Sequence, residues 1–146
     1  MKNKAAIVLL LILVLAFPAF AFTRSGDGEL DVALSILNTS GRSDYGTFKS
    51  EMVLSYNITA GKIDFFYLKM GVQPADVFMI CVLATLAGVS IDRVYALYRV
   101  NKPQGWGYIA KQLGIKPGSK AFHSLKGKAR NHTDHIKNKG KGKKKK

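Results

Sequence analysis

The sequence is poor in cysteine and in recognisable catalytic motifs. Its single cysteine, Cys81, excludes an intramolecular disulfide and a paired-cysteine metal site. It contains no phosphate-binding Gly-rich loop, no Gly-x-Ser-x-Gly turn and no His-Glu-x-x-His zinc motif. Cys81 lies in the apolar stretch VFMICVLATLAG, which predicts a buried, unreactive thiol. Stability must therefore come from a packed core.

Acidic residues are also scarce, with nine Asp and Glu against 23 Lys and Arg. The imbalance lies mainly at one end. Residues 124–146 carry ten basic residues and one acidic residue, whereas residues 22–123 carry eleven and eight. The same end has few apolar residues, so it would bury too little surface to offset its conformational entropy. We therefore predict a disordered basic tail at residues 126–146.

Few residues in the sequence suggest a catalytic or metal site. Asp76 and Asp92 stand where helix starts use carboxylates, so capping explains them without catalysis. His132 and His135 are weak metal candidates, since neighbouring lysines would repel a cation. We expect no cofactor and no catalytic residue. An enzyme of unrecognised type stays an alternative, because carboxylate pairs meet in space rather than in sequence.

The first 21 residues have the pattern of a secretory signal peptide. Lys2 and Lys4 precede an apolar run at residues 5–17, and the tripeptide AFA ends at Ala21. The 13-residue run is shorter than the roughly 20 residues that span a bilayer, which favours removal over a retained anchor. We predict cleavage after Ala21 and an exported protein, periplasmic or secreted.

The remaining chain predicts a single all-α domain at residues 22–125, a compact bundle of about five or six short helices. Residues 28–38 fit either a helix face or an alternating strand, and residues 39–44 are expected to form a loop. The segment that begins at Pro74 is apolar on nearly every side, which indicates a helix at the centre of the core.

One corner pattern occurs three times in this domain. Gly71, Gly88 and Gly114 each follow an apolar or small residue and precede Val or Ile. Such a glycine takes the left-handed conformation that ends a helix, and the next residue packs back on the last turn. We expect three helix ends of this kind.

The stretch GWGYIAKQLGIKPGSKAFHSLK at residues 105–126 fits two interpretations. A DNA-binding helix-turn-helix would need an apolar residue where Lys120 stands, and Pro117-Gly118 would fall inside its turn. A structural corner that closes the core around Trp106 fits better. The residues expected to form the core of this motif are Trp106, Ile109, Leu113, Gly114, Ile115 and Phe122.

The same stretch, together with PAD at residues 74–76, resembles a signature of uncharacterised exported bacterial proteins. The shared pattern reads PAD followed by GWG-x-IAK-x-LGIKPGS-x-x-FH-x-LK, and the resemblance runs from about Glu29 to Lys126. It implies export and a common fold. It implies no activity and no catalytic residue.

These features together predict an exported, non-catalytic interaction module. Its polycationic tail would contact lipid head groups or envelope polysaccharide, or extracellular nucleic acid. The expected contact residues are Lys126, Lys128, Arg130, Lys137, Lys139, Lys141, Lys143, Lys144, Lys145 and Lys146. One alternative is non-specific nucleic-acid binding, with Lys111, Lys116 and Lys120 of the helix-turn-helix-like segment acting beside the tail. Another is a tail that only aids solubility.

Overall fold

The computed structural model describes residues 21–142, and for residues 136, 137 and 139–142 it describes the backbone alone. Its elements are α2 (Gly28–Ser43), α3 (Tyr45–Tyr56), α4 (Ala60–Asp64), the π-helix η1 (Phe65–Lys69), α5 (Pro74–Ala87), α6 (Ile91–Asn101), the 3-10 helix η2 (Lys102–Gln104), α7 (Trp106–Gln112) and α8 (Lys120–Gly142). Residues 1–20 of the predicted signal peptide and residues 143–146 lie outside the described part. The all-α prediction is confirmed for the described residues, which contain no strand.

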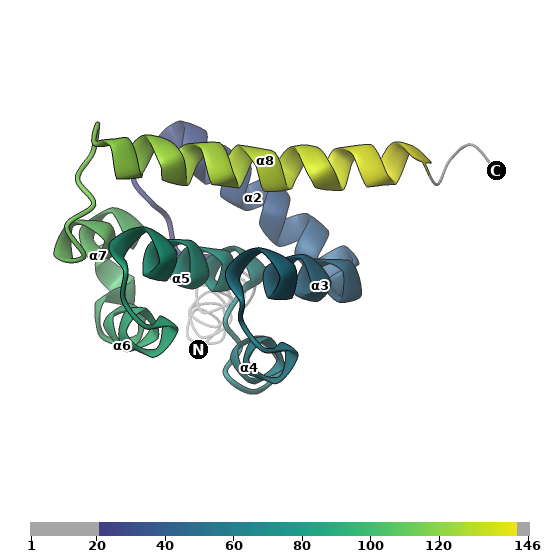
Figure 1. The fold of residues 1–146 in the computed structure, drawn as a ribbon, viewed down its shortest axis with the longest axis horizontal. Helices are drawn as coiled ribbons and strands as arrows, with labels where there is room; N and C mark the ends of the chain where they lie inside the picture. Colours follow the sequence, from purple (N-terminus) through teal and green to yellow (C-terminus); the bar gives the residue numbers. More distant parts are fainter. Residues whose placement is uncertain (1–20, 143–146) are drawn as a thin grey trace, which may run out of the picture.

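Helix α5 occupies the centre of the domain, as its apolar sequence predicts. It packs against α2, α3, α6, α8 and η1, and every residue from Pro74 to Ala84 is buried. Helices α2 and α8 lie along one side of α5, and α4 and α6 lie on the opposite side (Figure 1). Between residues 21 and 142 no helix has both the length and the apolar composition needed to cross a membrane.

The expected loop at residues 39–44 is wrong, because α2 continues to Ser43. Asp27 caps its start by accepting from the Leu30 N–H at 2.9 Å, and the open question of helix or strand at residues 28–38 is settled as helix. Gly41 allows the extension. A Cβ there would lie 2.7 Å from Cβ of Pro74, so only glycine lets the end of α2 approach α5 this closely.

The three glycine corners are confirmed. Gly71, Gly88 and Gly114 have φ angles of +65°, +65° and +80°. After each glycine, a backbone N–H donates to a carbonyl of the preceding helix: Val72 to Phe66, Val89 to Ala84 and Ile115 to Ala110. These bonds satisfy carbonyl groups that the helix end leaves free.

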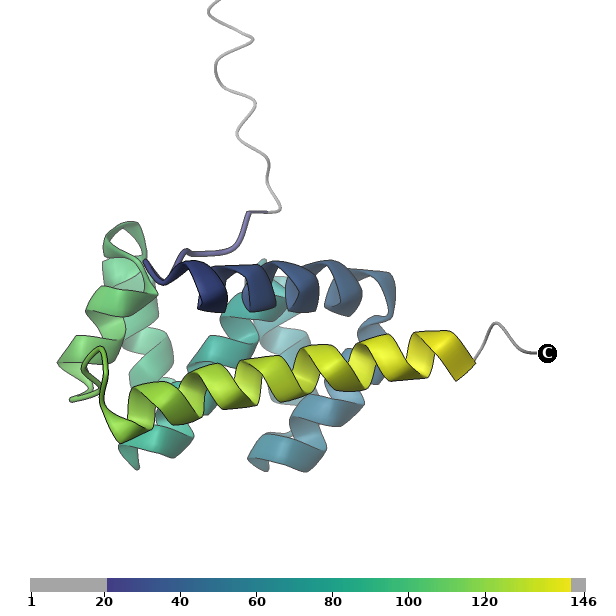
Figure 2. The ribbon, with the colours of Figure 1, turned by 90° about the horizontal axis from the view of Figure 1, so that it is seen from above.

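The predicted disordered tail is wrong for its described residues. Helix α8 is 23 residues long and runs through residue 142, so the bundle is not built of short helices alone. Leu125, Ala129 and Thr133 recur every four residues and are buried. They form one helix face that packs on α2 and α5 (Figure 2). Few apolar residues suffice because they share one face, so the domain extends past the predicted boundary at residue 125.

Candidate functional site

The motif at residues 105–126 contributes one donor, Trp106, to a buried carboxylate. Trp106 is fully buried, and its Nε1 donates to Oδ1 of Asp76 at 2.7 Å. The hydroxyl of Tyr98 donates to Oδ2 at 3.0 Å, and the Tyr98 and Trp106 rings stack with centroids 5.1 Å apart. Burial raises the pKa of Asp76, while these donors oppose the shift. Asp76 is therefore a buried acceptor, which the expectation of simple helix capping missed.

The glycines on either side of Trp106 admit the N-terminal segment, residues 22–25, to the core. The Trp106 N–H donates to the carbonyl oxygen of Arg24 at 2.8 Å. A Cβ on Gly105 would lie 2.9 Å from that oxygen, and one on Gly107 would lie 2.5 Å from the carbonyl oxygen of Ser25. The motif therefore positions backbone against backbone, and it joins α7 to residues 22–25.

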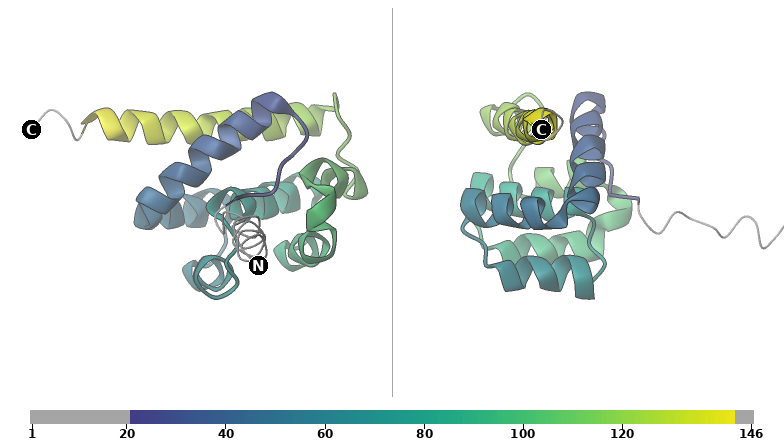
Figure 3. Two further views of the ribbon diagram at one scale, coloured as in Figure 1. Left: turned by 180° about the vertical axis from the view of Figure 1, so that it is seen from behind. Right: turned by 90° about the vertical axis from the view of Figure 1, so that its right-hand side faces the viewer.

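The other motif residues have structural positions as well. Ile109 and Ile115 are buried, Leu113 and Phe122 are half-buried, and Gly114 is left-handed. Residues 113–119 separate α7 from α8. Helix α7 packs on α6, whereas α8 packs on α2 and α5, which is not the arrangement of a helix-turn-helix (Figure 3). Lys111, Lys116 and Lys120 are exposed.

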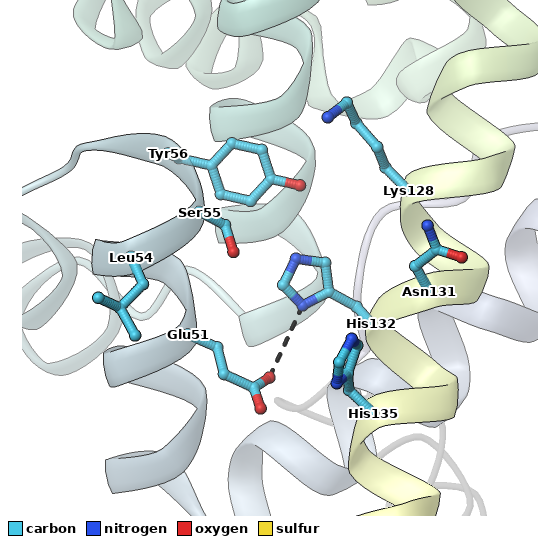
Figure 4. Close-up of a pocket in the computed structure, with 8 residues that line it drawn as sticks. All are labelled: Glu51, Leu54, Ser55, Tyr56, Lys128, Asn131, His132 and His135. Atoms are coloured by element: carbon cyan, nitrogen blue, oxygen red, sulfur yellow. Dashed lines mark ion pairs between the residues drawn. The ribbon is translucent and has the colours of Figure 1, made fainter.

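A hollow of about 340 Å³ lies between α3 and α8. Its lining combines a carboxylate, two imidazoles, an amine, an amide and two hydroxyl groups. The residues are Glu51, Leu54, Ser55 and Tyr56 from α3, and Lys128, Asn131, His132 and His135 from α8 (Figure 4). The residues from α3 are more than 70 positions from those of α8 in the sequence. These residues come together because α8 packs beside α3, an arrangement that the sequence did not predict.

His132 is the most constrained side chain of this hollow. Its Nδ1 lies 3.7 Å from Oε2 of Glu51, and both side chains are only about 15% exposed. The ring stacks on Tyr56 and meets the edge of Phe78. Burial lowers the pKa of His132, and the opposing charge of Glu51 limits the shift. A neutral imidazole beside a carboxylate can accept a proton, so this pair has the chemistry of a general base.

The described residues bring no further metal ligand to His132 and His135. Among residues 21–142, no three His, Cys, Asp or Glu side chains come together as metal ligands. His132 also packs against aromatic rings instead of lying in a disordered tail. Cys81 is fully buried, and burial raises the pKa of its thiol to about 12, which keeps the thiol protonated and unreactive.

The basic residues predicted to contact polyanions divide into two groups. Lys126 pairs with Asp27 at 3.4 Å and with Glu29 at 2.5 Å, and Arg130 pairs with Glu29 at 2.5 Å. Lys128 lines the α3–α8 hollow. These three residues belong to the domain body. The second group is the lysine-rich end, residues 137–146, of which 137–142 continue the helical backbone of α8.

The chain matches no known family model, and no curated protein or solved structure is significantly similar to it. The resemblance to exported bacterial proteins therefore stays a prediction from the motif at residues 105–126.

Proposed function

We propose that this protein is an exported, non-catalytic interaction module that contacts anionic polymers through its lysine-rich end, residues 137–146. The supporting observation is the position of that end. The C-terminal turns of α8 reach beyond α2 and α3, away from the domain body (Figures 1 and 2). Residues 134–142 contain three lysines and one aspartate, and four more lysines follow at residues 143–146, so this end of the sequence is strongly cationic.

The ion pairs at the start of α8 indicate that this part of the helix attaches to the domain, whereas the lysines that follow are available for binding. Glu29 of α2 pairs with Lys126 and Arg130, which contributes to holding this part of α8 on the domain. The seven lysines beyond residue 136 follow a fixed helical base. Near an anionic membrane, each such lysine contributes about 1 kcal/mol of attraction, which salt screens. Binding through them would be strong at low salt and largely independent of sequence or stereochemistry.

An exported protein meets only the anionic polymers outside the cytoplasm. Lipid head groups and anionic envelope polysaccharide are the partners we propose, and extracellular nucleic acid is the competing polyanion. All three present repeated phosphate, sulfate or carboxylate groups, which lysine contacts as a point charge.

The proposal is tested by two altered chains that keep the packed part of α8. One ends at residue 135, which retains the buried residues Leu125, Ala129 and Thr133. The other is the full chain with its last seven lysines changed to glutamine, which preserves length and helix propensity. Co-sedimentation with anionic vesicles and retention on heparin should be lost in both chains. Unchanged binding would refute the proposal.

The nucleic-acid alternative has its own discriminating variant. The triple substitution Lys111→Ala, Lys116→Ala and Lys120→Ala removes exposed charge from the domain body and leaves the lysine-rich end intact. If DNA binding is the function, this triple variant should show a shallower salt dependence of DNA affinity. If the lysine-rich end acts alone, the salt dependence should not change.

A second candidate function, an enzyme of unrecognised type, is favoured by the Glu51–His132 pair. The ring of His132 lies between Glu51 and the side chains of Ser55 and Tyr56, in a hollow open to small molecules (Figure 4). A carboxylate that orients an imidazole is the arrangement of a general base, and a nearby hydroxyl could be its proton donor.

A chromogenic ester such as p-nitrophenyl acetate gives a direct test of this candidate. His132→Gln should abolish any hydrolysis above background if the pair is catalytic. His123→Gln is the matched control, because His123 is an exposed histidine outside the hollow. Equal rates for the unaltered chain and both variants would remove the enzymatic candidate.

A further inference from the structure

The N-terminal segment, residues 22–25, fills a slot formed by α2, α5 and α7. The Thr23 N–H donates to Oδ1 of Asp76 at 2.9 Å, and the Ser25 N–H and hydroxyl both donate to Oδ1 of Asp31 at 2.7 Å. With the Trp106 N–H on the carbonyl of Arg24, the segment is held by backbone contacts on both sides. Thr23 is buried. The start of the domain is therefore part of its core.

The chain leaves this slot between residues 21 and 22. Ala21 is exposed, Phe22 is half-buried and packs on the core, and Thr23 is buried. This is the bond that the signal-peptide pattern marks for cleavage. The site of predicted processing and the edge of the core thus coincide.

Asp76 lies within electrostatic reach of the nitrogen that such a cleavage would free. Successive backbone nitrogens are at most about 3.7 Å apart, so the nitrogen of Phe22 lies within about 6.6 Å of Oδ1 of Asp76. The three hydrogen bonds to Asp76 come from neutral donors, the N–H of Thr23, the indole of Trp106 and the hydroxyl of Tyr98. A buried carboxylate is costly unless an opposite charge offsets its desolvation.

We propose that cleavage after Ala21 creates an α-ammonium group on Phe22 that pairs with the buried Asp76 and locks the N-terminal segment into its slot. The cleavage is hydrolysis of the Ala21–Phe22 peptide bond by a signal-peptidase-type endoprotease. Water adds its hydroxyl to the carbonyl carbon of Ala21 and a proton to the nitrogen of Phe22, which takes a second proton from solvent. The inference rests on the export part of the proposed function and is independent of the role of α8.

Other charged groups surround this position and shape the test. The surface hollow around residues 21–26 is lined by four basic residues, Arg24, Arg99, Lys102 and Lys111. The positive charge of Lys102 also lowers the pKa of Asp76. Asp31 and Tyr98 are titratable groups that contact the slot, and Tyr108 lines the same surface hollow. These cations disfavour a further positive charge on Phe22. The decisive measurement is therefore whether a difference in melting temperature depends on Asp76.

The experiment compares two chains released from a fusion by a protease that leaves no extra residue. One begins at Phe22. The other begins at Ala21, which keeps the total charge but moves the ammonium one residue outward, to an exposed position. At pH 7 the chain that begins at Phe22 should have the higher melting temperature, by roughly 3 °C or more. Equal melting temperatures would overturn the proposal.

The Asp76→Asn substitution completes a cycle with these two chains. The difference in melting temperature should disappear when Asp76 is replaced, and its persistence would overturn the proposal.

If the Asp76→Asn chains do not fold, pH provides the second readout. A carboxylate partner raises the pKa of the α-amino group in the folded chain above its ordinary value of about 8, so the added stability is present below pH 8 and is lost as pH rises through the folded value. A difference between the two chains that persists well above pH 10 would contradict an ionic origin. Neither outcome depends on polyanion binding.

Discussion

The indole nitrogen of Trp106 lies 2.7 Å from Oδ1 of Asp76, and both residues are fully buried. This hydrogen bond joins the first turns of α5 and α7 across 30 positions of the sequence. Because Asp76 also accepts from Thr23 and Tyr98, one carboxylate connects four separate parts of the fold. Among the buried polar residues of the described part of the chain, it is the most completely buried one.

The substitution Trp106→Phe should destabilise the domain by about 2–4 kcal/mol, because it removes a donor from a buried carboxylate and leaves a void beside Tyr98. Urea denaturation measures the change. Tyr108→Phe is the control, since Tyr108 is exposed, and its effect should stay within about 0.5 kcal/mol. Equal effects of the two substitutions would contradict this structure of the core.

Two glycine substitutions should have opposite effects. Gly107→Ala places a methyl group 2.5 Å from the carbonyl oxygen of Ser25, so the N-terminal segment must move, at a cost of about 1–3 kcal/mol. Gly127→Ala meets no atom within 4 Å and lies inside α8, so it should stabilise the domain by about 0.5–1 kcal/mol. Urea denaturation of both variants is the measurement. A Gly107→Ala chain as stable as the Gly127→Ala chain would contradict the close approach.

His132 should make the domain less stable in acid. Burial lowers the pKa of His132 in the folded chain below the ordinary value of about 6.5. The unfolded chain therefore binds this proton more readily, and stability is lost as pH falls from about 6.5 through the folded value, by up to about 1.4 kcal/mol per pH unit. Thermal melts between pH 5 and pH 8 should show a flatter profile for His132→Gln.

Glu51 gives this prediction a second variant. Its charge holds the pKa of His132 up, so Glu51→Gln should lower that pKa further and steepen the loss of stability below pH 6.5. A profile unchanged by either substitution would contradict the Glu51–His132 pair.

The docking of α8 can be tested at Leu125. This side chain is 1% exposed, and Leu125→Ala should cost about 2–4 kcal/mol. Hydrogen exchange along α8 should accelerate at the same time. Leu54→Ala removes the same atoms from a side chain that is 85% exposed and should change stability by less than about 0.5 kcal/mol. Slow exchange in α8 of the Leu125→Ala chain would show that the helix is held by other means.

Local signals in the sequence predicted much of the fold. The glycine corners at Gly71, Gly88 and Gly114 follow from backbone conformation, and the central helix follows from its uninterrupted apolar residues. In the motif around Trp106, the indole is buried and Gly114 is left-handed after α7, which is the geometry expected of a structural corner. These features depend on residues close together in the chain, where propensity and capping act directly.

The features that the sequence did not predict depend on distant partners. The polar composition of residues 126–146 predicted disorder. The few buried residues of α8 instead share one helix face and pack on α2. The pairing of Glu51 with His132 then follows from that docking, across 81 positions of the chain. Likewise, Asp76 suits a helix start, and only the tertiary structure brings Trp106 and Tyr98 to it.

The most direct test of the central proposal is the affinity for vesicles with about 30 mol% anionic lipid, compared between the full chain and the chain whose last seven lysines are glutamine. We predict that the full chain binds at least roughly 100-fold more tightly at low salt, and that about 0.5 M salt removes the difference. Equal affinities at low salt would contradict the role assigned to the lysine-rich end, residues 137–146.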